Sequence, residues 1–237
     1  MFNASIFKYF VDTNGLLYES PFVFLSISYL TMNSEKRIKI AIQKKGRLNE
    51  PSRKFLASLG LELPGTNGKE LVVMCQNKPV SVFNVRDNDI PSYVSKSVVD
   101  FGIVGLDVVR EAGLKVSIKK RLGFCECTLV IAVPADSSIK TVQNLQGKRI
   151  ATSYPNVLSG FLKKRNIKAK IVVVEGSVEL APYLKAADAV CDITQTGRTL
   201  REFNLIPIKT ILKSEAVLIG SPGRKKRVQL SFMSKRT

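Results

Sequence analysis

The sequence predicts an α/β fold with mainly parallel sheets, and two observations carry this prediction. From Arg37 onward, runs rich in Val and Ile alternate with stretches of helical length, a pattern that implies parallel strands joined by crossover helices. In addition, 45% of the 237 residues are apolar, which is enough for one large core or two smaller ones.

The strand-like runs are short and rich in β-branched residues, as buried strands are. In chain order they occur at 37–43, 71–75, 80–85, 101–104, 128–133, 148–152, 170–174, 189–193 and 206–219, the last long enough for two strands. Helix-like stretches lie between several of them, at 50–59, 89–99, 106–112, 155–165, 177–186 and 198–203. The helix predicted at 89–99 has Asp89 as a plausible N-cap and Pro91 in its first turn.

The run from Asp192 to Leu200 is the strongest candidate site. An apolar stretch delivers it as a strand would, and Thr196, Gly197 and Thr199 then open a predicted helix. Backbone N–H groups, hydroxyls and the positive end of a helix dipole can together hold a phosphate monoester. Asp192 would accept hydrogen bonds from nearby sugar hydroxyls, which describes a ribose 5-phosphate pocket. From these residues alone, an ordinary Thr N-cap with a Gly in the turn stays open as an alternative.

Charge and composition restrict the chemistry. The chain carries 37 Lys and Arg against 19 Asp and Glu, a net charge of +18 that suits polyanionic ligands. It contains no His, which excludes Ser-His-Asp and Cys-His catalysis. Of its four Cys only Cys125 and Cys127 are close in sequence, so neither a metal site nor a disulfide framework is predicted. Reduced thiols in a cytoplasmic protein fit best.

The two ends stand apart from this pattern. Residues 20–34 are uncharged, but this is fewer than the roughly 18 to 20 apolar residues of a membrane helix, and no membrane association is predicted. We expect residues 1–31 to be a non-native or disordered extension. Residues 223–237 form a basic tail, which is either a nucleic-acid patch or a solvated end; we favour the second, with no nucleic-acid partner.

Five further motifs occur in order along the chain. They are Lys45-Gly46-Arg47-Leu48, Arg86-Asp87-Asn88-Asp89-Ile90-Pro91, Asp100-Phe101-Gly102-Ile103-Val104-Gly105, Ile150-Ala151-Thr152-Ser153-Tyr154-Pro155 and Gly176-Ser177-Val178-Glu179-Leu180-Ala181-Pro182. With the Asp192 run, they resemble the motifs of the ATP phosphoribosyltransferase family, in which that run binds 5-phosphoribosyl-1-pyrophosphate (PRPP). The resemblance covers about residues 36 to 220. Each motif alone is weakly specific, whereas six in order are strongly so.

The resemblance implies a two-lobed fold like that of type II periplasmic binding proteins, with the active site in the cleft. The break near Ala132-Val133-Pro134 reads as the crossover between lobes. On this basis the first lobe comprises 32–132 and 205–222, and the second comprises 133–204.

The activity implied is the first step of histidine biosynthesis, in which N1 of the adenine of ATP displaces pyrophosphate from PRPP to give phosphoribosyl-ATP. Mg²⁺ would arrive with PRPP and leave with pyrophosphate. The chain would form a homo-oligomer. It resembles either a short form, which works with a regulatory subunit similar to histidyl-tRNA synthetase, or a truncated long form.

The resemblance also assigns roles residue by residue. Arg86 and Arg47 are the candidate catalytic residues, acting on phosphate charge, although a surface ion pair is the alternative for each. The PRPP-binding candidates are Asp192, Thr194, Thr196, Gly197, Arg198, Thr199 and Glu175. The ATP-binding candidates are Lys45, Gly46, Gly105, Tyr154 and Ser177. For Tyr154 a buried core position is the alternative.

Two departures from the family pattern bear on activity. Thr128 stands where the family usually has Arg, and Lys185 stands where it usually has Gly. If residue 185 adopts a positive φ, Lys there costs about 1–2 kcal/mol. The alternatives to an active enzyme are a non-catalytic protein of the same fold that binds anionic ligands, and an inactive truncated homologue.

Overall fold

The computed structural model describes residues 10–11, 17–18, 37–65 and 70–221. The chain divides into two compact units, Met1–Ile38 and Lys39–Thr237. In the first unit, β1 (Phe10–Val11) pairs antiparallel with β2 (Leu17–Tyr18). The rest of the predicted extension and the whole of the predicted basic tail lie outside the described residues.

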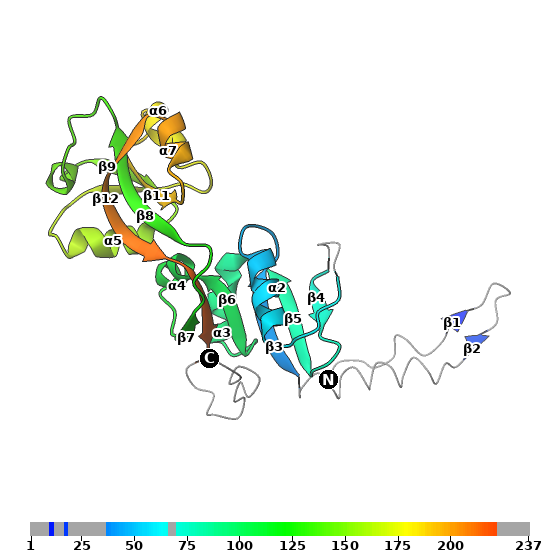
Figure 1. The fold of residues 1–237 in the computed structure, drawn as a ribbon. Helices are drawn as coiled ribbons and strands as arrows, with labels where there is room; N and C mark the ends of the chain where they lie inside the picture. Colours follow the sequence, from blue (N-terminus) through cyan, green and yellow to red (C-terminus); the bar gives the residue numbers. More distant parts are fainter. Residues whose placement is uncertain (1–9, 12–16, 19–36, 66–69, 222–237) are drawn as a thin grey trace. The chain divides into compact units, whose positions relative to one another are not determined.

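A six-stranded sheet forms the first lobe of the second unit, in the order β4-β5-β3-β6-β13-β7 (Figure 1). Its strands are β3 (Ile38–Gln43), β4 (Val72–Met74), β5 (Val80–Val85), β6 (Phe101–Gly105), β7 (Ser117–Arg121) and β13 (Ala216–Gly220). The helices of this lobe are α2 (Asn49–Ser58), the 3₁₀ turn η1 (Asp87–Asp89), α3 (Ile90–Ser95) and α4 (Leu106–Ala112). Every residue of β6 and β13 is buried, so these two strands form the centre of the lobe.

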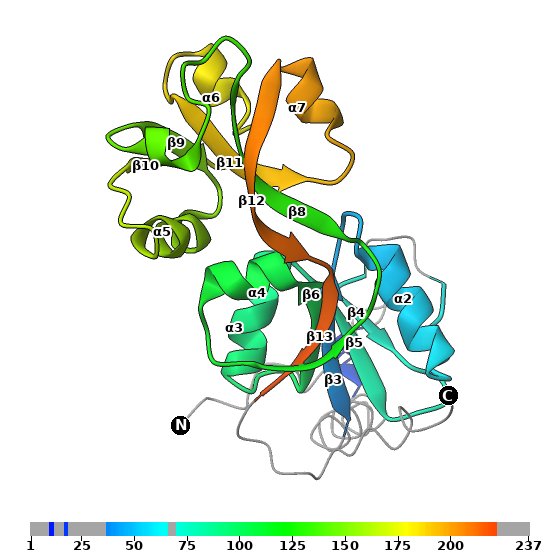
Figure 2. The same cartoon turned by 60° about the vertical axis from the view of Figure 1, so that its left-hand side comes forward.

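A five-stranded sheet forms the second lobe, in the order β10-β9-β11-β8-β12 (Figure 2). Its strands are β8 (Cys127–Pro134), β9 (Arg149–Thr152), β10 (Lys170–Val173), β11 (Ala189–Thr194) and β12 (Leu205–Ser214). The helices here are η2 (Val142–Leu145), α5 (Pro155–Lys163), α6 (Leu180–Tyr183) and α7 (Arg198–Glu202).

Successive side chains of β8 belong to two different hydrophobic cores, one on each face of the sheet. Leu129 and Ile131 pack with Leu158 of α5, whereas Val130 and Ala132 belong to the cluster that holds Leu200 of α7. Successive side chains of a strand point to opposite faces, so one apolar run supplies both cores. The sheet is therefore covered by α5 on one face and by α6 and α7 on the other.

The crossings between the lobes differ from those that the sequence predicted. Because β8 and β12 both lie in the five-stranded sheet, the chain passes between the sheets at 122–126 and again at Glu215, rather than near 132 and 205. The antiparallel pairing runs from Leu205 opposite Pro134 to Ser214 opposite Cys127. An apolar strand fits the core of either lobe equally well, so the composition of β8 and β12 did not indicate which sheet they join.

The α/β class is confirmed, but both sheets are mixed rather than mainly parallel. β9 pairs parallel with β10 and β11, and β3 pairs parallel with β6, whereas β8, β12 and β13 make antiparallel pairs. The strands that carry the chain out to the second lobe and back again must run in opposite directions. β7 was missed because Ser117–Arg121 is rich in exposed Lys and Arg, which is typical of an edge strand. Among the described helices, none combines the length and the apolar composition needed to cross a membrane.

Candidate functional site

The loop between β11 and α7 encloses a cavity of about 220 Å³. Gly197 has a φ of +71°, a left-handed conformation that turns the chain into α7. Its N–H donates to Thr194 Oγ1 at 3.0 Å, and the N–H of Arg198 donates to Thr196 Oγ1 at 3.4 Å. Six predicted PRPP-binding residues line this cavity, namely Asp192, Thr194, Thr196, Gly197, Arg198 and Thr199.

The charged side chains around this cavity come from three segments. Arg198 Nε contacts Glu202 Oε1 at 2.8 Å, but both side chains are more than half exposed, so this ion pair is weak and can be released. Burial raises the pKa of Asp192 to about 6, an effect that the N–H of Ile193 opposes and the charge of Glu179 reinforces. Asp192 is therefore poised to change charge near neutral pH.

Glu179, rather than the predicted Glu175, lies beside Asp192. Glu179 lines the cavity, while Glu175 and Ser177 are exposed and do not. The sequence indicated an acid near this point, but which acid reaches the cavity depends on the turn that leads into α6. Gly176, with a φ of +110°, makes part of that turn.

A second loop, after β3, carries Lys45, Gly46 and Arg47. Gln43 fixes this loop, because its Oε1 accepts from the N–H of Leu48 at 3.0 Å and its Nε2 donates to Asp87 at 2.9 Å. Gly46 has a φ of +116°, and a Cβ there would lie 2.9 Å from Gln43 Oε1. The motif thus requires Gly for the close approach of a neighbouring side chain as well as for its backbone conformation.

Arg47 is tied to the segment that crosses between the lobes. Its NH2 donates to Cys127 Sγ at 3.0 Å, while the thiol of Cys125 donates to the Arg47 carbonyl oxygen at 3.3 Å. Burial raises the pKa of the Cys125 thiol, in keeping with its role as a donor. The surface ion pair that was the alternative for Arg47 is not formed among the described residues.

Tyr154 lies near Asp107, Asp192 and Cys127. Burial raises the pKa of Tyr154, and its interactions with Asp107, to which its hydroxyl donates a hydrogen bond, and with Asp192 and Cys127 raise it further. Cys127 and Asp107 also contribute electrostatically to Arg47. Asp107 was missed in the sequence; the available signal was an acid two residues after Gly105, at the start of a predicted helix.

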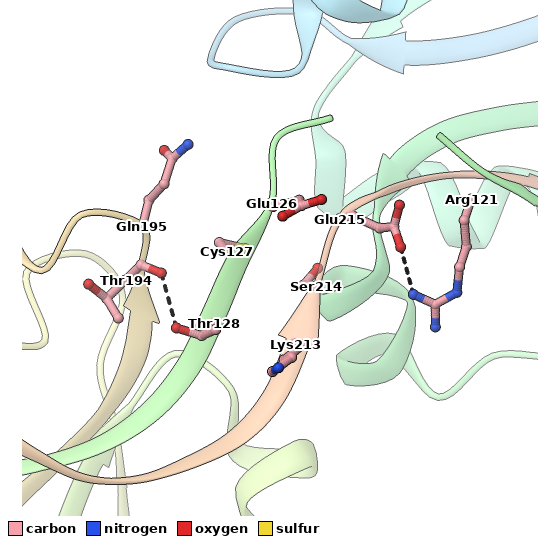
Figure 3. A pocket seen from close by; sticks show the side chains of 9 residues that line it. All are labelled: Arg121, Glu126, Cys127, Thr128, Thr194, Gln195, Lys213, Ser214 and Glu215. Atoms are coloured by element: carbon pink, nitrogen blue, oxygen red, sulfur yellow. Dashed lines mark hydrogen bonds and ion pairs between the residues drawn. The ribbon is translucent and has the colours of Figure 1, made fainter. Parts of the chain in front are cut away.

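A larger cavity of about 480 Å³ adjoins the first, and Thr194 and Gln195 line both (Figure 3). Its other lining residues come from the crossing segment, β7, β8 and β12, including Arg121 paired with Glu215 at 2.7 Å. Thr128, at the position where Arg was expected, donates from Oγ1 to the Thr194 carbonyl oxygen at 3.3 Å. Lys213 lines this cavity, and its side chain makes no hydrogen bond or ion pair among the residues that the structure describes.

Arg86 lines neither of these two cavities. It is exposed, and its side chain makes no hydrogen bond or ion pair within the described part of the chain. Lys45, Gly46 and Gly105 do not line them either. Across residues 37–65 and 70–221, no group of three or more Cys, Asp or Glu side chains is placed to hold a metal ion.

Comparison with known proteins extends this picture. Residues 86–235 match the family model HisG, ATP phosphoribosyltransferase. The chain is 44% identical over 189 residues to the ATP phosphoribosyltransferase of Maricaulis maris, an alignment covering 77% of this chain and 64% of that protein. The chain spans 64% of the length of this relative, and 64 and 65% of the length of the ATP phosphoribosyltransferases of Cytophaga hutchinsonii and Parabacteroides distasonis.

Two solved structures show the same arrangement of elements. The ATP phosphoribosyl transferase (HisG:HisZ) complex from Thermotoga maritima superposes with a TM-score of 0.67 at 31% identity, covering 78% of this chain and 88% of that chain. The arginine-, lysine-, histidine-binding protein ArtJ from Geobacillus stearothermophilus gives a TM-score of 0.53 at 15% identity, covering 82% of this chain and 86% of that chain. The second likeness shows the fold alone, which is the two-lobed fold of type II periplasmic binding proteins. With the family match over residues 86–235, these findings show that the chain belongs to the ATP phosphoribosyltransferase (HisG) family.

Proposed function

We propose that this chain transfers the phosphoribosyl group of PRPP to N1 of the adenine of ATP, giving phosphoribosyl-ATP and pyrophosphate. The observation that carries the proposal is the loop from Thr194 to Thr199, which closes around one cavity with Asp192 at its edge. Family membership supports the same reaction, the first step of histidine biosynthesis.

The loop residues supply binding and orientation. The 5-phosphate of PRPP is held by Thr196, Gly197, Arg198 and Thr199, because this turn offers two exposed hydroxyls and the exposed Arg198 guanidinium. Thr194 holds the turn in shape through its bond to the N–H of Gly197. Asp192 accepts hydrogen bonds from the ribose hydroxyls, and we assign the neighbouring acid to Glu179 in place of Glu175.

The reaction itself needs charge stabilisation and positioning. N1 of ATP attacks the anomeric carbon as the bond from that carbon to the diphosphate oxygen breaks, and the electron pair leaves with pyrophosphate. Arg47 and Arg86 stabilise the charge on the departing diphosphate. The ring nitrogen already has a lone pair, so alignment does most of the work and no His is needed.

The residues proposed for the ATP side are Lys45, Gly46, Gly105, Tyr154 and Ser177. Tyr154 contributes an aromatic ring for the adenine. Lys45 and Gly46 lie on the exposed loop that also holds Arg47, where an ammonium and backbone N–H groups can meet nucleotide phosphates. Gly105 acts through packing, because Asp107 Oδ1 occupies the space that a Cβ would need.

Mg²⁺ is proposed as part of the substrate, bound to the diphosphate oxygens of PRPP. Metal-ligand groups of three or more Cys, Asp or Glu are not found among the described residues, and Mg²⁺ held mainly by phosphate oxygens requires none. Bound there, it would neutralise part of the charge that develops on the leaving group.

A partner and an assembly belong to the same proposal. The similar solved structure is a HisG:HisZ complex, so we propose a regulatory subunit for this chain, in a homo-oligomeric cytoplasmic enzyme. The two readings of the sequence, a short form and a truncated long form, differ on this point. Only a short form gains activity when a regulatory subunit is added.

The test is pyrophosphate release from ATP and PRPP by the purified chain, alone and with the regulatory subunit. Turnover that requires both substrates is expected, and Thr199→Val should raise the KM for PRPP much more than that for ATP. PRPP binding without turnover would favour the non-catalytic binding protein. Loss of both binding and turnover would favour the inactive homologue.

A further inference from the structure

The end of β12 places a lysine in line with the loop that follows β11. Lys213 lies directly opposite Thr128 of β8, and Thr128 lies directly opposite Thr194 of β11. Residues that lie directly opposite each other in antiparallel strands have their side chains on the same face of the sheet. These three side chains therefore form one row across three strands. The row ends at Thr194, which accepts from the N–H of Gly197 in the loop.

The same face of the sheet carries the proposed ribose ligand. Asp192 lies two residues before Thr194 on β11, and side chains two apart on a strand share a face. Val130, which lies opposite Asp192, packs in one core with Leu200 of α7. The acid proposed for the ribose hydroxyls, the loop proposed for the 5-phosphate and Lys213 are thus on one side of the sheet.

The cavity of about 480 Å³ gives Lys213 room to meet a ligand. Lys213, Thr128 and Thr194 all line it, and it adjoins the smaller cavity of the loop (Figure 3). The Lys213 side chain is exposed and makes no hydrogen bond or ion pair among the described residues. Arg121, which also lines this cavity, is paired with Glu215 at 2.7 Å. Of these two cations, Lys213 is the one left for an incoming anion.

The structure of PRPP indicates which anion reaches this position. PRPP carries one phosphate on C5 of the ribose and a diphosphate on C1, so a loop that holds the 5-phosphate leaves the diphosphate at the other end of the ribose. The diphosphate gains negative charge as its bond to C1 breaks. A lysine ammonium is a point charge with three donors on a flexible stem, which can follow those oxygens as they leave.

We propose that Lys213 binds the diphosphate of PRPP in the 480 Å³ cavity and stabilises the charge on the departing pyrophosphate. This inference rests on the proposed function, to which it adds a cation that contacts the substrate. The electron pair of the broken bond leaves with pyrophosphate, and Lys213 donates hydrogen bonds to its oxygens without transferring a proton. Thr128 stands where the family usually has Arg, and Lys213 lies directly across from it. Lys213 thus supplies from β12 the charge that β8 lacks.

Calorimetric Kd values for three ligands, each measured alone with Mg²⁺, test the proposal. Pyrophosphate has the diphosphate alone, ribose 5-phosphate has the 5-phosphate alone, and PRPP has both. Lys213→Met keeps most of the side chain and removes its charge. It should weaken the binding of pyrophosphate and of PRPP by about tenfold or more, the loss expected for a hydrogen bond to a charged group. The Kd for ribose 5-phosphate should stay within twofold of that of the unchanged chain.

Lys209→Met is the matched control. Lys209 is an exposed lysine of the same strand, but it lies opposite Ile131, whose side chain packs with Leu158 in the core on the other face of the sheet. The two Met variants have the same net charge, and Lys209→Met should bind all three ligands as the unchanged chain does. Equal losses of pyrophosphate binding in the two variants would reveal a general effect of net charge and would overturn the proposal.

A charge restored on the neighbouring strand should restore binding. Thr128→Arg in the Lys213→Met chain presents a guanidinium from the position directly opposite. The double variant should bind pyrophosphate more tightly than Lys213→Met and approach the unchanged chain. If it binds ribose 5-phosphate normally but pyrophosphate no better than Lys213→Met does, the diphosphate is not held at this row of side chains.

Turnover separates this inference from the proposed function. Lys213→Met should lower kcat/KM for PRPP at least tenfold, with an unchanged melting temperature. If the unchanged chain converts ATP and PRPP, and Lys213→Met matches it in kcat/KM and in the Kd for pyrophosphate, only the inference fails. If the ligands bind in the expected pattern but no pyrophosphate is released from PRPP, the binding role of Lys213 stands and the catalytic proposal fails. If the unchanged chain binds neither PRPP nor pyrophosphate, both fail.

Discussion

Replacing Gly197 with Ala tests whether the loop after β11 binds phosphate. Gly197 has a φ of +71°, and a non-Gly residue in this region costs about 1–2 kcal/mol. The new Cβ would lie 3.1 Å from Arg201 Nη1, an exposed group that donates to the Thr196 carbonyl oxygen at 3.1 Å and needs to move by only a few tenths of an ångström. The cost is therefore mainly backbone strain.

The backbone strain at residue 197 can have one of two effects. Either it is retained and lowers the free energy of unfolding, or the peptide rotates and breaks the bond from the Gly197 N–H to Thr194 Oγ1. In the second case PRPP must restore the native turn when it binds. A penalty of about 1–2 kcal/mol then weakens PRPP binding by about 5- to 30-fold.

Calorimetric titration of PRPP measures this loss, and Gly147→Ala is the control. Gly147 lies in the same lobe with a φ of +74°, and no atom lies within 4 Å of its missing Cβ. Its Ala variant should lose similar stability and keep the Kd for PRPP within twofold. If Gly197→Ala binds PRPP as tightly as the unchanged chain, the phosphate is not held by this loop.

Three further predictions follow from single side chains. Lys185→Gly should raise the free energy of unfolding by about 0.5–1 kcal/mol, because relief of the strain at a φ of +57° outweighs the unfolded-state entropy of Gly. Lys164→Gly is the control: residue 164 has a helical φ of −61°, so this change should lower the free energy of unfolding. Urea unfolding measures both variants. PRPP affinity should fall as pH drops through about 6, where Asp192 is protonated, and Asp192→Asn should remove this component and leave only the titration of the phosphate. The same raised pKa means that the unliganded chain loses stability through Asp192 as pH rises from about 4 to about 6. Arg86→Ala should lower kcat/KM at least tenfold, about 1.4 kcal/mol, with an unchanged melting temperature; a sharp fall in melting temperature would assign Arg86 to folding.

Local features of this chain could be predicted from the sequence, and long-range pairings could not. The strand β11 and the loop after it are contiguous, so one run of residues contains the whole turn. The usual Gly at the position of Lys185 raised the question of a positive φ, and the φ of Lys185 is +57°. By contrast, β8 was predicted as a strand of the first lobe, whereas the structure places it in the sheet of the second lobe beside β12, a partner that is distant in the sequence.

The candidate site shows the same difference between local features, which the sequence predicts, and distant contacts, which it does not. Asp107 finds its partners Tyr154 and Ser214 at separations of 47 and 107 residues, and no local pattern marks such a contact. The choice between Glu175 and Glu179 depended on a turn whose course the apolar pattern does not specify. The tie between Arg47 and Cys127 spans 80 residues. Sequence motifs identified which segments matter, while the folded chain decides which side chains meet.

The start of β8 connects the two proposed substrate regions through consecutive residues. Cys127 accepts from Arg47, on the loop proposed for nucleotide phosphates, and Thr128 donates to the carbonyl oxygen of Thr194, at the start of the PRPP loop. Neighbouring residues of a strand point to opposite faces, so the two contacts use opposite sides of one backbone. A shift of β8 by one residue would break both contacts at once. The antiparallel pairing of β8 with β11 and β12 fixes that register, with Thr128 opposite Thr194 and Cys127 opposite Ser214. The strands that cross between the lobes thus fix the position of Arg47 relative to the PRPP loop after β11, and they also carry the chain from one lobe to the other.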